Sequence, residues 1–365
     1  MKKWQLSTLS SFLIIIIIIL TTACSTHRSY LNNRSQNEVV AIMQKVADWQ
    51  LAHPRHEDTD WRNGTLFAGI TELYKITEDS TYLDHLMKMG ERNLWLPGPR
   101  LRHADDHCIG QTYIELFFIK KDPRMILALQ KGFDEMMAAP NRGREDWWWC
   151  DALFMAPPAL ARIATATGEQ KYLDFMNSMW WDTTDLLYDR KEHLYYRDSR
   201  FFSKREKNGK RVFWSRGNGW VLAGLCRVLQ HMPGEYPNRA SYICLFKEMS
   251  VKVASLQQED GFWRASLLDP DSYPAGESSG TAFFTYALAW GINEGLLLSE
   301  HYLPAVQKGW NALVGAVDSD GRLGWVQQTG DQPQPTRKEA SETYGTGAFL
   351  LAGSEIARLF ANSPH

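Results

Sequence analysis

Apolar residues recur along most of the chain at intervals of three and four, the spacing that places them on one face of an α-helix. The pattern predicts roughly twelve helices joined by short polar corners, and hence about six antiparallel hairpins. The expected helices fall at residues 37–53, 63–77, 80–93, 107–119, 123–139, 149–167, 169–186, 216–231, 238–257, 279–299, 301–316 and 342–361.

Alternate helices differ in composition, and this difference predicts how the hairpins assemble. Every second helix is richer in Gly, Ala and aromatic residues and poorer in charge, which is typical of an inner ring enclosed by more amphipathic outer helices. We therefore expect an all-α fold, an (α/α)6 barrel or toroid. Its inner helices run in the same direction, so their N-termini gather on one rim around a central cavity.

Two segments depart from the helical pattern. Residues 193–214, HLYYRDSRFFSKREKNGKRVFW, alternate with a period of two and contain Asn208-Gly209, which predicts a small inserted β-hairpin. Pro157 and Pro158 lie inside an expected inner helix and should kink or restart it.

The N-terminus is typical of an export signal. Residues 1–24 have a basic start, an apolar stretch and small residues before Cys24, as in a lipoprotein signal, although Thr21 stands where Leu is usual. We expect a lipidated Cys24, a tether over 25–36 and one catalytic domain over 37–363, in an exported, periplasmic or membrane-anchored protein; simple secretion is the alternative.

The remaining cysteines, Cys108, Cys150, Cys226 and Cys244, form no CxxC pair and are expected to be isolated buried thiols.

Charge and composition limit the classes of ligand that the chain is expected to bind. The net charge is only -2, and one short basic run, KREKNGKR at 204–211, is too little to track a nucleic acid. With 15 Trp among 365 residues, the chain is instead suited to a ligand with flat apolar faces. The sequence leaves the oligomeric state open.

Asp151 is the first candidate catalytic residue. It follows Trp147, Trp148 and Trp149 in EDWWWCDALFMA, at the head of an expected inner helix. As a helix cap it would contribute about 1 kcal/mol. An acid beside apolar rings, however, has its charged form desolvated, which raises its pKa toward the range of a proton donor.

Asp106, in LRHADDHCIGQTY, lies at the head of the neighbouring inner helix. We expect Asp105 to cap this helix and Asp106 to point inward, so that Asp106 and Asp151 form a pair of carboxylates for acid/base work. His107 is expected to be half-buried and is also a candidate ligand contact. The His and Asp spacing matches no standard zinc motif, so no metal or cofactor is expected.

Further candidates lie at the same rim. In FWSRGNGW, the glycines allow close approach of a ligand, Arg216 can hold a carboxylate in its guanidinium fork, and Asn218 is at the same helix start. Most Trp residues are expected in the core. The rim positions that could stack on sugars are Trp61, Trp148, Trp149 and Trp220.

The segments WWWCDALFMAPPALAR, ADDHCIGQTY, SRGNGW, DGFWRASLLDP with ESSGTAFFTYAL, and GWVQQTGDQP together resemble the unsaturated rhamnogalacturonyl hydrolases, glycoside hydrolase family 105, and the related unsaturated glucuronyl hydrolases of family 88. The resemblance covers about residues 40–361. It implies an (α/α)6 enzyme that removes a terminal 4,5-unsaturated uronic acid from lyase-generated oligosaccharides, here of the pectic, rhamnogalacturonan type.

The resemblance also implies roles for individual residues. The vinyl ether is hydrated, with Asp151 matching the principal acid/base, Asp106 the assisting aspartate and Arg216 holding the uronate. Arg197, in LYYRDSRF, stands where a histidine is expected and is a further substrate-contact candidate. The alternatives are a glucuronyl hydrolase acting on glycosaminoglycan-type oligosaccharides, an ordinary inverting glycosidase on the same barrel, and a non-catalytic glycan-binding lipoprotein.

Overall fold

Two concentric layers of helices make up the computed structural model, which describes residues 35–139 and 142–361. The outer helices are α2 (Gln36–Ala52), α4 (Ser80–Arg92), α6 (Arg124–Ala138), α9 (Lys171–Leu187), α11 (Arg239–Ala254) and α13 (Ser299–Gly315). The inner helices are α3 (Trp61–Thr77), α5 (Gly110–Lys120), α8 (Pro157–Thr167), α10 (Ser215–Leu229), α12 (Ser278–Asn293) and α14 (Thr343–Ala361). The predicted segments and their order are confirmed.

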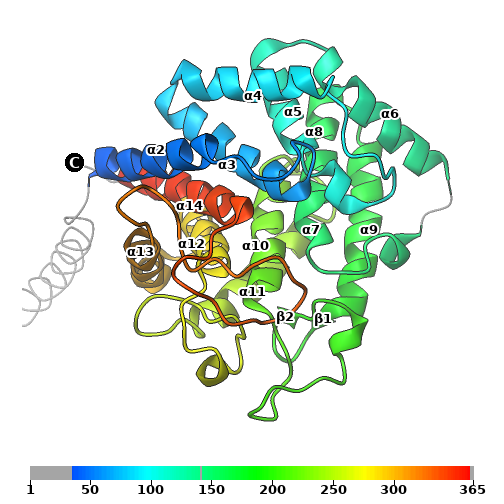
Figure 1. Cartoon of the computed structure of the whole chain (residues 1–365). Coiled ribbons are helices and arrows are strands. Elements are labelled where there is room, and N and C mark those ends of the chain that lie inside the picture. The colour runs from blue at the N-terminus through cyan, green and yellow to red at the C-terminus, as the bar shows by residue number, and fades with distance from the viewer. Residues whose placement is uncertain (1–34, 140–141, 362–365) are drawn as a thin grey trace, which may run out of the picture.

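The inner helices close into a ring. α3 packs on α5, α5 on α8, α8 on α10, α10 on α12, α12 on α14, and α14 returns to α3. The outer helix α2 also packs on α14, so the first and last described helices lie side by side, blue beside red in Figure 1. This closed ring of hairpins is the predicted (α/α)6 toroid.

Burial follows the predicted division between the layers. Every residue of α10 is buried, and α14 is buried from Thr343 to Ala357, whereas α4 buries only one face. Such close packing requires glycine at some contacts. A Cβ at Gly347 of α14 would collide with the Thr65 carbonyl of α3, and one at Gly224 of α10 would collide with the Leu153 carbonyl.

The two departures from helical pattern have different outcomes. The proline pair separates the short helix α7 (Ala152–Met155) from α8, as predicted. The predicted β-hairpin is displaced: strands β1 (Tyr188–Asp189) and β2 (Leu194–Tyr195) pair antiparallel, and around Asn208-Gly209 there is only an isolated bridge between Arg205 and Arg211. The ladder cannot extend past β2 because Asp198 caps a 3-10 turn, η3 (Ser199–Phe201).

The cysteines that the structure describes form no disulfide. Cys108, Cys150 and Cys226 are buried free thiols, as expected, but Cys244 is exposed on α11, where the sequence pattern suggested burial. The predicted signal peptide, Cys24 and most of the predicted tether lie outside the described residues. Within the described ranges, we find no helix with the length and apolarity needed to cross a bilayer.

Candidate active site

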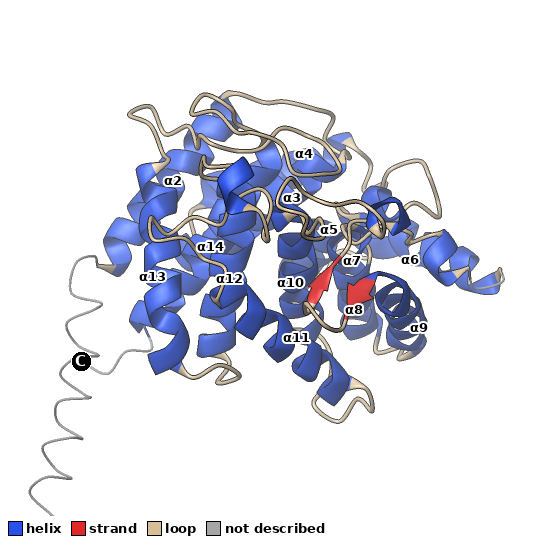
Figure 2. Cartoon of the chain, turned by 90° about the horizontal axis from the view of Figure 1, so that it is seen from below, coloured by secondary structure: helices blue, strands red, loops and turns tan. Residues whose placement is uncertain are grey.

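A cavity of about 300 Å³ lies where the inner helices begin. The longer loops gather at one end of the helices, as Figure 2 shows, and the cavity is formed among them. Its charged walls are Asp105, Asp151, Arg197, Arg216 and Asp331, and its other lining residues are Trp61, Trp149, Met155, Trp214, Thr329 and Gly330. The predicted convergence of helix N-termini on a single site is therefore observed.

Asp151 is buried in this cavity rather than used as a helix cap. Its residue is 8% exposed, and its side chain makes no capping hydrogen bond to α7. The carboxylate lies 3.5 Å from Arg197 Nε and accepts a hydrogen bond from the Cys150 thiol, also at 3.5 Å. Burial raises the pKa of Asp151, and the charges of Arg197 and then Arg216 oppose that rise. The carboxyl group thus keeps a proton more readily than an exposed aspartate.

Asp105 is the second carboxylate in the cavity. It lies in the short 3-10 turn η1 (Ala104–His107), just before α5. Burial, reinforced by the nearby charge of Asp151, raises the pKa of Asp105 to about 7. Two carboxyl groups, each with a raised pKa, therefore line the same cavity.

The structure reverses the expected orientations of Asp105 and Asp106. Asp106 points away from the cavity and is bound by Arg100, whose Nη2 lies 2.5 Å from Asp106 Oδ1 and whose main-chain N–H donates to Oδ2 at 2.6 Å. A Cβ at Gly98 would collide with the same carboxylate, so the 98–100 segment folds closely around it. The structure therefore does not place Asp106 on the cavity wall, where we expected it, because Arg100 binds its carboxylate.

The Arg197 guanidinium faces Asp151, and contacts with Asp198 and Trp148 hold it in place. Its Nη1 lies 2.8 Å from Asp198, and its guanidinium stacks 5.0 Å from the centre of the Trp148 ring. Arg197 lies two residues after the end of β2 (Leu194–Tyr195), which positions it at the cavity. The structure places Arg197 on the cavity wall, and its contact with substrate stays a prediction.

Arg216 also lies on the cavity wall, but most of its guanidinium already contacts other groups of the protein. Its guanidinium is between the rings of Trp214 and Tyr344, at 4.4 and 4.7 Å from their centres. Nη1 donates to the Gln327 carbonyl at 2.5 Å and Nη2 to the Gln328 carbonyl at 3.1 Å. Arg216 therefore fixes the loop before α14 while it keeps a positive charge beside Asp151.

The four candidate tryptophans differ in where they lie relative to the cavity. Trp61 and Trp149 line the cavity. Trp148 is 41% exposed and stacks on Arg197 at the entrance. Trp220 is fully buried and packs 4.2 Å from the Phe283 ring centre, so its predicted contact with a ligand is wrong.

Asn218 and His107 stabilise the fold rather than line the cavity. The Asn218 amide accepts from Tyr195 N and donates to the carbonyls of Tyr195 and Trp214, which attaches α10 to β2. His107 is buried against Phe133, and its Nε2 lies 2.9 Å from the Leu101 carbonyl. Neither residue lines the cavity. The beginning of an inner helix also needs side chains that form hydrogen bonds with unpaired backbone groups nearby, and these two residues do so.

Sequence reasoning missed the loop that closes one side of the cavity. Residues 329–331 precede α14 and line the site with Trp214. The only signal was the glycine-containing stretch GWVQQTGDQP, which carries no periodicity. Across residues 35–139 and 142–361, no group of His, Cys, Asp or Glu side chains is arranged to hold a metal ion.

The comparisons with known proteins agree with this architecture. A family model, Glycosyl Hydrolase Family 88, matches residues 31–360. The chain belongs to glycosyl hydrolase family 88. The resemblance drawn from its motifs to this group of enzymes is thereby confirmed, and so is the prediction that it is a glycoside hydrolase.

Two relatives and one solved structure illustrate the family 88 match. An unsaturated 3S-rhamnoglycuronyl hydrolase of Formosa agariphila is 43% identical over 89% of this chain and 92% of its own. An enzyme of the same name from an Alteromonas species is 38% identical over 86% of this chain and 84% of its own. A family 88 glycosyl hydrolase from Bacteroides vulgatus, 31% identical, superposes with a TM-score of 0.85 over 89% of this chain and 99% of its own.

Proposed function

We propose that this family 88 hydrolase removes a terminal 4,5-unsaturated uronic acid from lyase-generated oligosaccharides by hydrating the C4=C5 double bond. The observation that carries the proposal is the pairing of Asp105 and Asp151, both with a raised pKa, beside two arginines in one cavity. Carboxyl groups that keep a proton near neutral pH supply an acid for the alkene, and the arginines suit the uronate.

The reaction follows from the electron distribution of the vinyl ether. The protonated Asp151 gives its proton to C4, which places positive charge on C5 and the ring oxygen. The resulting carboxylate takes a proton from a water molecule as the water oxygen bonds to C5. The C5 hemiketal then opens, and the hemiacetal left at C1 breaks down to release the second sugar and a keto acid. Asp151 is restored by the water proton, so the cycle balances.

Asp105 takes the assisting role that the sequence suggested for Asp106. It lies on the cavity wall, where the charge of Asp151 helps to raise its pKa, whereas Asp106 is bound by Arg100 and does not line the cavity. With a pKa of about 7, Asp105 can orient the water or return a proton near neutral pH.

We assign the uronate to the positive side of the cavity. Arg197 is placed to hold the carboxylate, since its Nε is buried and makes no hydrogen bond within the described structure. Arg216 adds a second positive charge. Its guanidinium keeps N–H donors beyond those that bind the Gln327 and Gln328 carbonyls. Trp61 and Trp149 offer apolar faces for the sugar ring.

The second sugar is proposed to be rhamnose. Relatives at 43% and 38% identity are named for a 3S-rhamnoglycuronyl substrate, which supports rhamnose beside the unsaturated uronate. The pectic rhamnogalacturonan type expected from the motifs also pairs rhamnose with a uronic acid, so the two types differ in the uronate and its substituents. Pectic and glycosaminoglycan-type disaccharides are the comparison substrates. We further propose that the protein is exported and lipidated at Cys24, which labelling with a radioactive fatty acid in wild type and Cys24→Ala would test.

The direct test of the proposed function is loss of the ultraviolet absorbance of the conjugated alkene. The protein from about residue 36 onward is incubated with unsaturated disaccharides of the three types. Hydration predicts loss with wild type and none with Asp151→Asn. Persistence of the absorbance on all three substrates, with folded protein, would contradict the proposal and favour the ordinary inverting glycosidase or the glycan-binding alternative.

A further inference from the structure

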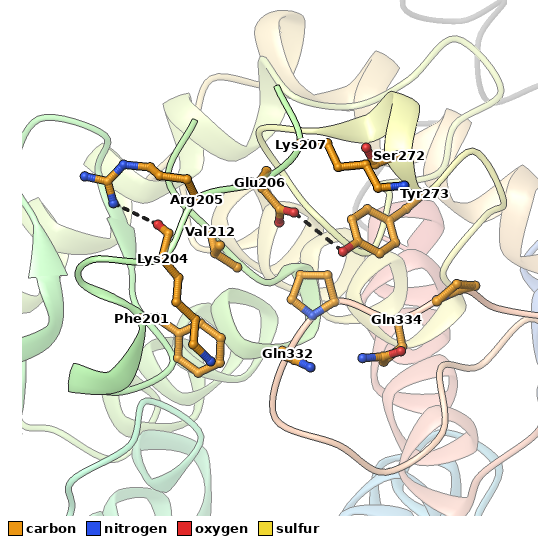
Figure 3. Close-up of a pocket in the computed structure, with 12 residues that line it drawn as sticks. Phe201, Lys204, Arg205, Glu206, Lys207, Val212, Ser272, Tyr273, Gln332 and Gln334 are labelled. Carbon is orange, nitrogen blue, oxygen red and sulfur yellow. Dashed lines mark hydrogen bonds between the residues drawn. The ribbon is translucent and has the colours of Figure 1, made fainter. Parts of the chain in front are cut away.

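A second cavity of about 470 Å³ lies beside the catalytic one and is larger than it. It is formed by three loops: residues 201–212 after η3, residues 272–273 at the end of η4 (Pro270–Ser272), and residues 332–335 before α14. Figure 3 shows the side chains that line it. The catalytic mechanism uses none of these residues.

The lining of this second cavity suits a sugar with a negative substituent. Phe201 and Tyr273 provide aromatic rings, while Gln332 and Gln334 bring carboxamides. Glu206 accepts a hydrogen bond from Ser266 at 2.6 Å and lies 3.5 Å from the Tyr273 hydroxyl. Such a mixture of rings and hydrogen-bonding side chains matches the apolar faces and hydroxyl edges of a pyranose.

The charge of the second cavity is positive on balance. Lys204, Arg205 and Lys207 line it against the single carboxylate of Glu206. Arg205 turns its guanidinium toward main-chain carbonyls, as Figure 3 shows, and donates to Lys204 O at 2.8 Å. Lys204 lies with its Nζ 4.1 Å from the centre of the Phe201 ring. Figure 3 places the Lys204 amine beside Phe201 and Lys207 beside Ser272 and Tyr273, so the two lysines can meet an anionic ligand from different sides of the cavity.

Only one loop separates the two cavities. Residues 329–331 line the catalytic cavity, and residues 332–335 line the second one. An ion pair between Arg200 and Asp331, at 2.8 Å, lies in the segment between the two cavities. Arg200 also contacts Asp198, which in turn holds Arg197 beside Asp151. A continuous set of contacts therefore connects the two cavities.

The dividing loop is held in place before any ligand binds. Gln327 accepts a hydrogen bond from Trp214 Nε1 at 3.0 Å and donates to the Gln332 carbonyl at 2.9 Å. Thr336 donates to the Gly276 carbonyl at 2.6 Å. Both cavities are thus preformed, which reduces the ordering cost of binding a chain across them.

We propose that the second cavity is a distal subsite for anionic sugar units of the same oligosaccharide, beyond the bond that is cleaved, with Lys204 and Lys207 binding the carboxylate or sulfate. The identity of the sugar chain rests on the proposed function. The subsite would let the enzyme prefer a tetrasaccharide to a disaccharide, since only the longer chain reaches past the Arg200–Asp331 ion pair.

The test compares two unsaturated substrates, a disaccharide and a tetrasaccharide, prepared by lyase digestion of a sulfated rhamnose–glucuronic acid polysaccharide. We measure kcat/KM for both with wild type and with the Lys204→Met/Lys207→Met double variant. The subsite predicts that the ratio of tetrasaccharide to disaccharide kcat/KM falls about tenfold in the double variant. The control is Lys131→Met, which removes an exposed lysine on α6 and should leave the ratio unchanged. An unchanged ratio in the folded double variant would overturn the subsite.

A binding measurement separates failure of the subsite from failure of the proposed function. If wild type consumes neither substrate, the proposed function fails, and calorimetry with the tetrasaccharide then decides the subsite alone. Weaker binding by the double variant supports the subsite, and equal binding overturns it. A chemically desulfated tetrasaccharide identifies the anion: the lysine dependence disappears if the lysines bind sulfate and remains if they bind carboxylate, and either result supports the subsite.

Discussion

Asp105 and Asp106 are neighbours in one 3-10 turn, yet only the Asp105 carboxylate lines the cavity. Asp105 lines the catalytic cavity near Asp151, whereas Asp106 is bound by Arg100 behind the turn. The first carboxylate is placed for chemistry and the second stabilises the loop that carries it. The two should therefore respond differently to the same substitution.

Replacing each by asparagine separates these roles. Asp105→Asn should lower kcat by about 10²-fold or more, because it removes an ionisable group from the cavity, while the protein stays folded. Asp106→Asn should destabilise the protein by about 1–2 kcal/mol through loss of charge-assisted hydrogen bonds with Arg100, and should keep activity within a few-fold. Turnover and thermal unfolding of the two variants check this. The reverse pattern would restore Asp106 to the catalytic role.

The raised pKa of Asp105 predicts how stability depends on pH. The folded protein holds this proton to about pH 7, whereas an unfolded chain releases it near the ordinary value of 3.8. The folded state therefore binds more protons between these values, so this group's contribution to the free energy of unfolding falls as pH rises through that window. A tenfold difference in proton affinity between the two states corresponds to roughly 1.4 kcal/mol.

The same argument makes Asp105→Asn a stabilising substitution above neutral pH. At pH 8 the variant lacks the buried charge, so its unfolding temperature should exceed that of wild type. Near pH 4 both side chains are uncharged, and the unfolding temperatures should converge. Calorimetric scans at the two pH values measure the difference. Equal unfolding temperatures at pH 8 would show that Asp105 is not desolvated as the structure indicates.

Arg197 is predicted to set the pH range of activity. Its charge is the largest influence that opposes the burial-induced rise in the pKa of Asp151. Arg197→Met should raise that pKa further and move the alkaline limb of the kcat profile to higher pH, because Asp151 then keeps its catalytic proton longer. Arg197→Lys retains the positive charge and should stay nearer the wild-type profile. Arg190→Met, on an exposed loop, is the matched control, and a shift there as large as in Arg197→Met would contradict the assignment.

Glycine at the contact between α3 and α14 is predicted to be essential for packing. Gly347→Ala should destabilise the protein by about 1–3 kcal/mol, because the added methyl group meets the Thr65 carbonyl. Gly315→Ala, at the end of α13, places its methyl group in open space and should be neutral or stabilising by up to about 1 kcal/mol. Urea unfolding of both variants is the measurement, and similar loss in both would argue against close helix approach.

The sequence predicted the layers of the fold well, because inner and outer helices bury different fractions of their surface and so differ in composition. The site was harder to predict for three physical reasons. Neighbours in a 3-10 turn point in different directions, and a contact with Arg100, six residues before Asp106, distinguished Asp106 from Asp105. All of α10 is buried, so no polarity pattern distinguishes Arg216 in the cavity from Asn218 outside it. The 329–331 loop has no periodicity at all.

The central claim is that the reaction starts at the alkene and not at the glycosidic bond. The most direct test compares an oxygen-linked unsaturated disaccharide with its sulfur-linked analogue, following both the alkene absorbance and the release of the second sugar, with Asp151→Asn as the inactive control. Hydration leaves the linkage atom untouched, so both substrates should lose absorbance at rates within about tenfold of each other. An ordinary inverting glycosidase must protonate the linkage atom, and sulfur accepts a proton poorly. Turnover of the oxygen-linked substrate with none of the sulfur-linked one would contradict the hydration account.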